Sequence, residues 1–161
     1  MAKDIDTLIV PALRKKKGCW GDMRHSPPVS ASDIRKWAIA TYWPTTPPAV
    51  FWDEAAAAAS RWRGLIAPPD FNPFAWPVHR PAANPLPVPK GLKLTGINGG
   101  QVENYGVPQR PGDIIAERMR VKDFHEREGR FGLMLHVALE AEWTNQGGDF
   151  VRRRVLTSIL Y

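Results

Sequence analysis

The sequence predicts an α+β fold in which a long, curved antiparallel sheet wraps around a central Ala-rich helix. The first observation is that apolar residues occupy every odd position from Phe131 to Trp143, a period-2 pattern typical of a strand with one buried face. The second is that the chain has 16 prolines but none in residues 112–161, as a sheet requires because proline cannot donate to the hydrogen-bond ladder. The third is a run of five alanines at residues 55–59.

Two helices are expected before the sheet. The first covers residues 32–42, with Ser32 as its N-cap, and the prolines that follow would end it. The second begins near Trp52 and continues through the alanines to Trp62, with acidic residues in its first turn, where the helix dipole favours them. Almost no polar face remains along the alanines, so we expect this thin helix to be buried. The alternative is a surface helix with high alanine propensity.

Strands are expected over four ranges: near residues 100–107, and over 113–123, 131–143 and 150–161. The connections 126–129 and 145–149 are short and contain residues that tolerate positive φ. Short connections between long strands indicate antiparallel neighbours. The last three strands should therefore form a meander, whose apolar face needs a helix or a second sheet to cover it.

A chain of 161 residues has the length of one domain. We expect a helical or extended lead-in over residues 1–28 and a single domain over residues 29–161. Within that domain, residues 68–89 combine prolines with aromatics, which favours an ordered extended loop at an interface or a pocket. The single cysteine, Cys19, excludes an internal disulfide and a cysteine-rich zinc site. No apolar run approaches the roughly 20 residues of a membrane helix, so we expect a cytoplasmic protein without membrane contact.

The formal net charge of +6 lies in the first part of the chain. Residues 1–111 carry 14 Lys and Arg against 8 Asp and Glu, whereas residues 112–161 carry 8 of each class. The explanations that remain open are a nucleic acid partner, an anionic small ligand such as a nucleotide-tailed thioester, and a solvated basic face. Nucleic acid is the less favoured partner, because the lysine run 15–17 is short and no nucleic-acid-binding motif is recognised.

No metal site and no cofactor are expected from the sequence. The histidines His25, His79, His125 and His136 are never three to five residues apart, so the usual spacing of metal ligands is missing. His136 falls on the polar side of a predicted strand, where a structural role is favoured over a catalytic one. Residues 98–100, Asn-Gly-Gly, lack the spacing of a phosphate-binding loop.

Several short motifs follow one another along the chain. They are Phe51-Trp52-Asp53-Glu54-Ala55, Trp62-Arg63-Gly64-Leu65-Ile66-Ala67-Pro68-Pro69, Gly96-Ile97-Asn98-Gly99-Gly100-Gln101, Arg110-Pro111-Gly112-Asp113, Arg130-Phe131-Gly132 and Thr144-Asn145-Gln146-Gly147-Gly148. In this order they make residues 29–160 similar to the MaoC-like dehydratase/hydratase family, in particular to its N-terminal-half type. The resemblance implies the hot-dog fold, a long antiparallel sheet around a central helix, in agreement with the periodicity.

The same resemblance implies that this chain has no catalytic residues of its own. Active members resemble Gly-Asp-x-Asn-Pro-Leu-His before the central helix, and their Asp and His exchange protons when water is added or removed. With the Trp-Asp-Glu motif as anchor, the Asp falls on Thr46, the Asn on Pro48 and the His on Phe51. Threonine and phenylalanine cannot exchange protons near neutral pH. Asp53 and Glu54 lie nearby and are better explained as first-turn helix acids.

In two-domain relatives the degenerate half supplies part of the acyl pocket, so the resemblance implies a substrate-binding role for the matching segments. The residues expected to bind substrate are Phe51, Trp52, Gly64, Ile66, Ala67, Pro68, Phe71, Phe74 and Trp76. The substrate would be an acyl-CoA or an acyl-ACP thioester. The resemblance leaves both fatty-acid and steroid chains open.

The leading hypothesis is a non-catalytic subunit of an enoyl-thioester hydratase or dehydratase, a lyase. A MaoC-like hot-dog partner would supply the Asp/His pair, in a heterodimer or heterotetramer joined side by side through the sheets. One alternative is a stand-alone homodimeric acyl-CoA hydratase that uses Asp53 or Glu54 as a non-standard acid or base. The other is a binding module without chemistry, which holds an acyl-CoA or an anionic polymer.

Overall fold

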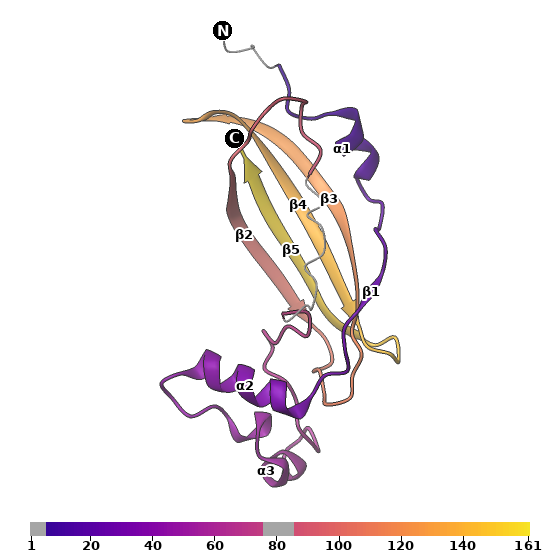
Figure 1. Cartoon of the computed structure of the whole chain (residues 1–161), viewed down its shortest axis with the longest axis vertical. Helices are drawn as coiled ribbons and strands as arrows, with labels where there is room; N and C mark the ends of the chain where they lie inside the picture. The colour runs from indigo at the N-terminus through magenta and orange to yellow at the C-terminus, as the bar shows by residue number, and fades with distance from the viewer. Residues whose placement is uncertain (1–5, 76–85) are drawn as a thin grey trace.

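The computed structural model describes residues 6–75 and 86–161, which form a five-stranded antiparallel sheet with helices at its two ends. The helices are α1 (Pro11–Lys16), α2 (Ala31–Tyr42) and α3 (Glu54–Ala59), with a 3-10 turn, η1 (Ala49–Phe51). The strands are β1 (Arg24–His25), β2 (Gly96–Tyr105), β3 (Ala116–Gly129), β4 (Gly132–Thr144) and β5 (Phe150–Leu160). Figure 1 shows α1 beside the upper part of the sheet, and α2 and α3 beyond its lower end.

The strand order is β1-β3-β4-β5-β2, and each neighbouring pair is antiparallel. β3, β4 and β5 form the predicted meander. β2 pairs with the side of β5 that faces away from β4. The chain therefore passes from β1 at one edge of the sheet to β2 at the other edge before it returns to form β3 beside β1. The α+β class and the long antiparallel sheet that the sequence predicts are therefore confirmed.

The hairpin between β3 and β4 is longer than the sequence predicts. Residues 126–129 belong to β3 and are not a connection. Gly129 lies opposite Gly132 in the ladder, so only Arg130 and Phe131 form the turn. Gly132 has φ +85°, in the left-handed region that glycine adopts without strain, and this conformation permits so tight a turn.

The odd-numbered face of β4 is buried, as its periodicity predicts. In the upper part of the sheet, Leu135 and Val137 form a core cluster with Leu8 and Leu13. Leu13, in α1, is fully buried. Partly buried leucines from residues 86–94 pack against the same cluster. The N-terminal segment thus covers part of the apolar face of the sheet.

A second core cluster joins the helical part of the chain to the lower end of the sheet. It contains Ile34 and Ala38 of α2 together with Trp143 of β4 and Val151 of β5. Ile34 and Ala38 are fully buried and lie four residues apart, on one face of the helix. This contact positions the loops around η1 and α3 against the sheet.

The N-cap of α2 is Ser30 and not Ser32. The Ser30 Oγ accepts a hydrogen bond from the Asp33 N–H at 3.0 Å, and Ser32 lies inside the first turn. Asp33 is also in this turn, where the helix dipole favours an acid. None of the helices within the described ranges has the length and apolarity to span a membrane.

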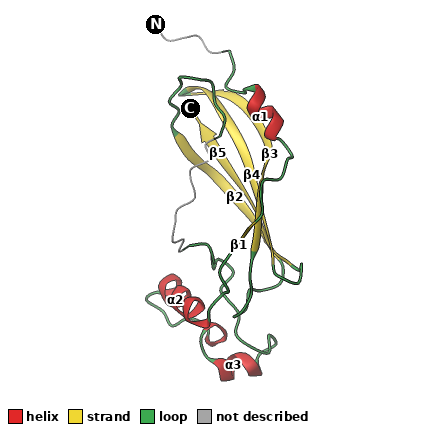
Figure 2. Cartoon of the chain, turned by 45° about the vertical axis from the view of Figure 1, so that its right-hand side comes forward, coloured by secondary structure: helices red, strands yellow, loops and turns green. Residues whose placement is uncertain are grey.

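The Ala-rich helix does not lie inside the sheet. α3 has six residues, and of its alanines only Ala57 is buried. Figures 1 and 2 both place α3 beyond the lower end of the sheet, so it is a surface helix and not the central helix that we expected. Its start is fixed locally, because Asp53 accepts a hydrogen bond from the Ala56 N–H at 3.0 Å. Alanine favours helix by propensity alone, and this preference does not require burial.

Candidate functional site

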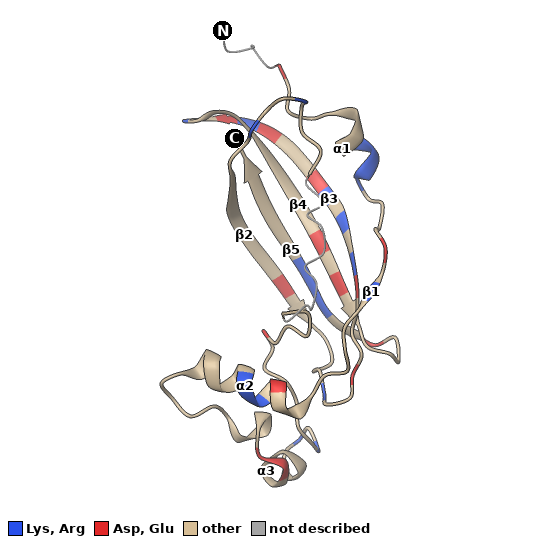
Figure 3. Cartoon of the chain, in the orientation of Figure 1, with Lys and Arg blue, Asp and Glu red and all other residues tan. Residues whose placement is uncertain are grey.

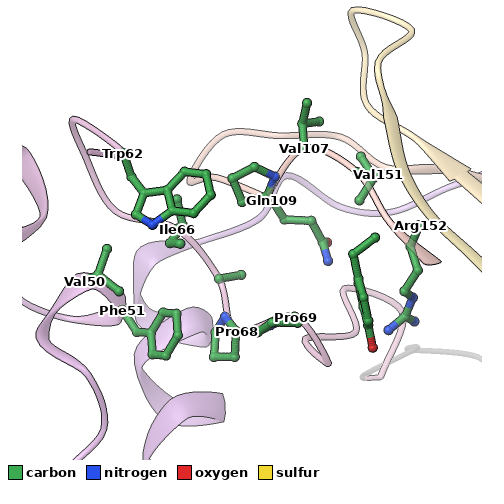
Figure 4. A pocket seen from close by; sticks show the side chains of 14 residues that line it. Val50, Phe51, Trp62, Ile66, Pro68, Pro69, Val107, Gln109, Val151 and Arg152 are labelled. Atoms are coloured by element: carbon green, nitrogen blue, oxygen red, sulfur yellow. The ribbon is translucent and has the colours of Figure 1, made fainter. Parts of the chain in front are cut away.

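A cavity of about 280 Å³ lies at the junction between the helical part of the chain and the lower end of the sheet. We call it the junction cavity. Its walls come from four segments, residues 50–51, 62–69, 105–109 and 151–152. Figure 4 shows Val50, Phe51 and Trp62 on one side of the cavity and Arg152 on the other, with Gln109 between them. Small-molecule pockets are typically about 300–1,000 Å³, so this cavity can hold a small ligand or part of a larger one.

Hydrogen bonds hold two of these wall segments together. The Ala67 N–H donates to the Gln109 carbonyl at 2.8 Å. The Arg110 guanidinium donates to the Trp62 carbonyl at 2.8 Å. Arg110 is itself fixed, because its N–H donates to the Asp113 carboxylate at 2.7 Å. Two motifs that are far apart in the sequence therefore meet at the cavity, and each stabilises the conformation of the other.

A close backbone contact forms another part of the wall. The Gly106 N–H donates to the Val151 carbonyl and the Val107 N–H to the Phe150 carbonyl, both at 2.9 Å, which extends the pairing of β2 with β5. A Cβ atom at Gly106 would lie 2.1 Å from the Phe150 carbonyl oxygen. Only glycine fits at this point of the wall without a shift of the backbone.

Four of the residues expected to bind substrate line the junction cavity: Phe51, Ile66, Ala67 and Pro68. Phe51 is 6% exposed, and its ring lies 5.9 Å from that of Tyr42. The resemblance implies a histidine at the position of Phe51 in active relatives. Here the same position contributes an apolar wall.

Three further expected residues lie away from the cavity or beyond the described ranges. Trp52 is 40% exposed, and its indole N–H donates to the Pro47 carbonyl at 3.0 Å. Gly64 lies beside the Arg110 side chain, where an added Cβ would meet the guanidinium at 3.5 Å. Trp76 falls outside the described residues.

The two remaining expected residues belong to the protein core. Phe71 packs edge-on against Trp37, with ring centroids 5.6 Å apart. Phe74 packs edge-on against Trp143 at 5.5 Å. Neither residue is among those that line the cavity.

The positions that the resemblance aligns with the catalytic motif hold no acid or base. Thr46 and Pro48 are exposed in the loop before η1, and Phe51 lies in η1. None of the described residues that line the cavity is Asp, Glu, His or Cys. Asp53 caps α3 and Glu54 lies in its first turn, as the sequence predicts. The described residues of the cavity wall therefore offer no side chain that exchanges protons near neutral pH.

Gln109 is a polar residue of the cavity that the sequence does not reveal. It is 4% exposed, and its Nε2 donates to the Phe71 carbonyl at 3.1 Å. No donor within residues 6–75 and 86–161 reaches its Oε1 atom, which is buried. A single glutamine among prolines and apolar residues gives no sequence signal for such a role.

Arg152 is the second polar residue that the sequence does not reveal. The alternation places it on the polar side of β5, but it lies opposite Trp143 and is 5% exposed. Its guanidinium lies 3.8 Å from the centroid of the Trp143 ring and 3.8 Å from the Glu103 carboxylate. Burial lowers the pKa of Arg152. Beside it, burial and the hydrogen bond to Glu103 raise the pKa of Tyr105.

A second polar site lies on the opposite face of the sheet. Glu140 and Glu142 are 2% and 8% exposed, although they stand on the even-numbered face of β4. Cationic side chains from β3 and β5 cover both carboxylates. This ionic cluster consists of Glu140, Glu142, Arg118, Arg120, Lys122 and Arg153. Figure 3 shows its acidic and basic positions alternating across β3, β4 and β5.

The carboxylates of the ionic cluster are held in their charged form. Burial raises the pKa of Glu140, but hydrogen bonds from Arg120 and Lys122 outweigh burial and hold this pKa below its ordinary value. Hydrogen bonds from Arg153 and Arg118 lower the pKa of Glu142. The carboxylates are covered by long side chains and not by the protein core. The cluster therefore has the character of a cross-strand network that stabilises the sheet.

His125 and His136 form a stacked pair across β3 and β4, with ring centroids 4.8 Å apart. Burial and the charge of His125 lower the pKa of His136. Across the part of the chain that the structure describes, no three His, Cys, Asp or Glu side chains are grouped as metal ligands. His79 lies outside this part.

The sequence matches one family model. The model is that of the FAS1-like, dehydratase domain region, and the match covers residues 18–154. A search of curated proteins gave no match.

Solved structures with the same fold support this match. A MaoC-like dehydratase from Rhodospirillum rubrum is 26% identical, with a TM-score of 0.59 over 88% of this chain and 91% of that chain. The ChsH1–ChsH2 complex from Mycobacterium tuberculosis gives 15% identity and a TM-score of 0.71 over 92% and 88%. C-terminally truncated HadBC, a 3R-hydroxyacyl-ACP dehydratase complex from the same organism, gives 20% and 0.60 over 91% and 97%. The predicted hot-dog fold is therefore confirmed.

Proposed function

This chain belongs to the family of the FAS1-like dehydratase domain region, among the MaoC-like hot-dog proteins, and we propose that it is the non-catalytic subunit of a heteromeric enoyl-thioester hydratase or dehydratase. The observation that carries the proposal is the junction cavity, which combines an apolar wall with the absence of a proton-exchanging side chain among its described residues. The chain would contribute the acyl-binding wall, and a partner would contribute the chemistry.

The reaction requires an acid and a base that act together. Adding water across an enoyl thioester needs one group to take a proton from water and one to protonate the carbon that gains hydrogen. The motif positions Thr46 and Phe51 cannot supply either group. Asp53 is engaged as a helix cap, which argues against the stand-alone enzyme. A MaoC-like partner with Asp and His would complete the site.

The edge of the sheet offers a place for that partner. Within the described residues β2 pairs only with β5, and its other edge leaves a row of backbone N–H and C=O groups available. Most of its ten residues are exposed, among them Val102 at 65%. A second hot-dog sheet could continue this one side by side. Two structures of similar fold are heteromeric complexes, which supports a heterodimer or heterotetramer.

The cavity wall and the net charge support an acyl thioester as the substrate class. Val50, Phe51, Trp62 and Val151 give the cavity an apolar surface that suits an acyl chain. The excess charge of +6 would serve the phosphates of an acyl-CoA or acyl-ACP, or an acidic partner subunit. Nucleic acid is not required to explain it.

The proposal is tested with three preparations: this chain alone, a MaoC-like chain that carries the Asp/His pair, and the two co-expressed and co-purified. Hydration of an enoyl-CoA is followed by the loss of absorbance of its conjugated double bond. We expect no turnover by this chain alone and turnover by the complex. Replacing the Asp of the partner by Asn should abolish that turnover.

A matched pair of variants tests the acyl-binding role within the complex. Ala67→Leu adds bulk to the cavity wall, whereas Ala58→Leu makes the same change at an exposed position of α3. We expect Ala67→Leu to raise KM several-fold for long acyl chains, while Ala58→Leu leaves KM near that of the unchanged chain. Equal effects of the two variants would contradict an acyl-binding cavity.

Turnover by this chain alone would overturn the proposal. The variant Asp53→Asn then decides for or against the stand-alone alternative, because asparagine is also a good N-cap and removes only the acid. Salt-sensitive binding of nucleic acid without binding of acyl-CoA would instead support a binding module.

A further inference from the structure

The guanidinium of Arg152 is a nearly buried cation in the wall of the junction cavity. Arg152 lines the cavity, and its side chain is 6% exposed. Figure 4 shows it on the side of the cavity opposite Phe51 and Trp62. The guanidinium lies over the Trp143 ring, 3.8 Å from its centroid. The ring attracts the positive charge, but it offers no oxygen to the N–H groups.

The N–H groups of Arg152 have no acceptor at short range. Within residues 6–75 and 86–161, the carboxylate within 4 Å of the guanidinium is that of Glu103, 3.8 Å from Nη1. This distance exceeds the usual N–H···O range of about 2.7–3.2 Å. The Tyr105 hydroxyl also lies near the guanidinium, and it donates its proton to Glu103. Arg152 therefore has charge compensation without a hydrogen bond of ordinary geometry to a described residue.

The guanidinium nitrogens remain accessible, in contrast to the side-chain oxygen of Gln109. That oxygen is fully enclosed and has no partner among the described residues, whereas no nitrogen of Arg152 is both enclosed and without a partner. Because these nitrogens make no hydrogen bond of ordinary geometry, they must keep some accessible surface. Arg152 contributes to the wall of the junction cavity, so a ligand there can contact its guanidinium.

The charges around Arg152 favour an uncharged acceptor. Arg152 and Glu103 together carry no net charge, so a ligand carboxylate would add an uncompensated negative charge to a mostly apolar cavity. A ketone oxygen accepts hydrogen bonds and brings no donor of its own. A hydroxyl brings a proton that needs an acceptor, and wall side chains such as Val107 and Val151 offer none.

We propose that the junction cavity selects acyl chains that carry a ketone remote from the thioester, and that the Arg152 guanidinium donates to the ketone oxygen. The ketone is remote because the thioester end must meet the acid and base of the partner. Trp143 already holds the guanidinium in place, so binding costs little side-chain freedom. The proposal rests on the proposed function, since it names the acyl group that the cavity would bind.

Binding of matched ligands tests the proposal, with the full-length chain alone and in its co-purified complex. The probes are decanoyl-CoA, oxodecanoyl-CoA isomers with the ketone at successive carbons beyond C5, the corresponding hydroxy compounds, and decanedioyl-CoA. Affinities are measured by isothermal titration calorimetry. We expect one or two adjacent oxo isomers to bind roughly tenfold more tightly than decanoyl-CoA, as one charge-assisted hydrogen bond allows. The hydroxy compounds and decanedioyl-CoA should not share this gain.

Two variants isolate the contribution of the guanidinium. The double variant Arg152→Met, Glu103→Gln removes the donors and the opposing charge together, so no buried carboxylate loses its cation. Methionine keeps an unbranched side chain against the Trp143 ring. In this variant the preference for the oxo isomers should disappear. Glu103→Gln alone keeps Arg152, so the preference should persist. A preference that survives in the double variant would overturn the proposal.

A spectroscopic measurement on the unchanged chain tests the same hydrogen bond without a substitution. The preferred oxo isomer is labelled with ¹³C at its ketone carbon, and its resonance is compared between the free and the bound ligand. A hydrogen bond from a guanidinium polarises the carbonyl and should move the bound resonance downfield of its position in water. An upfield shift would mean that the ketone lies in an apolar environment without a donor, which contradicts the proposal.

The remaining outcomes distinguish this proposal from the proposed function. If decanoyl-CoA and the oxo isomers bind equally well, the ketone preference is refuted while the acyl-binding role stands. If the double variant weakens all acyl-CoA ligands equally, Arg152 contacts a group that they share, and the ketone preference is again refuted. If no acyl-CoA binds to the chain or to its complex and none is turned over, the proposed function itself fails.

Discussion

The ionic cluster and the junction cavity bury polar side chains in opposite ways. In the cluster, both carboxylates have cationic partners, and the Arg118 and Arg153 guanidinium groups each lie 2.5 Å from Glu142. In the cavity, Gln109 makes one side-chain hydrogen bond and retains a buried acceptor. The cluster completes its interactions within the chain. In the cavity wall, no described residue completes the hydrogen bonding of Gln109.

The difference indicates how to separate structural from functional polar groups in this fold. Charged residues are conspicuous in a sequence, yet here the residues of the ionic cluster stabilise strand pairing. A neutral amide in an apolar wall is inconspicuous, yet its side-chain oxygen has no partner among the described residues. Completeness of hydrogen bonding, and not charge, distinguishes the two regions.

The largest effect on stability is expected from a substitution in the wall of the junction cavity. Gly106→Ala would place a methyl group 2.1 Å from the Phe150 carbonyl oxygen, so the end of β2 must move away from β5. We expect the free energy of unfolding to fall by about 3 kcal/mol, measured by urea denaturation. Gly21→Ala is the control, because its Cβ would meet the Met119 carbonyl oxygen at an ordinary 3.4 Å. Similar losses in both variants would show that the close contact is not the cause.

The second largest effect on stability is expected from a substitution in the ionic cluster. Glu140→Gln removes the charge that Arg120 and Lys122 share, and it leaves these cations facing each other. Because the cationic side chains are partly exposed, we expect a loss of about 1–2 kcal/mol, between the values for exposed and buried ion pairs. Urea denaturation measures the loss. A stability equal to that of the unchanged chain would mean that the cluster contributes nothing net.

The cluster should also make stability depend on pH. Glu140 and Glu142 have a lower pKa in the folded chain than the ordinary value of 4.5, so they bind protons more readily when unfolded. Their contribution is complete above the unfolded pKa and is lost as the pH falls through the lowered folded pKa. We therefore expect the free energy of unfolding to decrease as the pH falls below about 5.5.

The double variant Glu140→Gln, Glu142→Gln is the control for this pH dependence. Its stability should decrease less between pH 5.5 and pH 3 than that of the unchanged chain, by roughly 1 kcal/mol. An unchanged pH dependence would assign the acid sensitivity to other carboxylates.

The smallest effect on stability is expected at Gln109. Gln109→Met loses the hydrogen bond to Phe71 but also removes the unsatisfied acceptor, so these two changes oppose each other. We expect the free energy of unfolding to change by less than about 1 kcal/mol. A loss as large as that of Glu140→Gln would mean that Gln109 is primarily structural, which would remove the contrast between the two regions.

Much of the sheet could be predicted from the sequence because strand periodicity is a local property. Leu135 and Val137 are buried on the face that the odd positions of β4 indicate. Proline is absent from residues 112–161 because the ladder uses the N–H groups. The position of the turn at Arg130 and Phe131 could not be predicted in this way, because the polar residues before it continue the strand as readily as they form a loop.

The helical part and the site could be predicted only in part. Phe51 and Ile66 line the junction cavity, as the motifs predict, because each motif sets the backbone conformation of its own segment. The exposure of α3 could not be predicted, since alanine favours helix equally on the surface and in the core. Arg152 was missed because a sequence pattern shows which side of a strand a residue occupies and not which tertiary neighbours cover it.

The outer edge of β2, which no strand of the described residues covers, has a consequence for the behaviour of the protein in the cell. A strand of ten residues with available backbone groups is a template for addition of further strands, including those of other copies. If a partner sheet normally covers this edge, chains made in excess of the partner are prone to aggregation and proteolysis. Balanced synthesis of the two chains would then be a requirement for solubility, so the genetic coupling of their expression would be under selection through protein quality control.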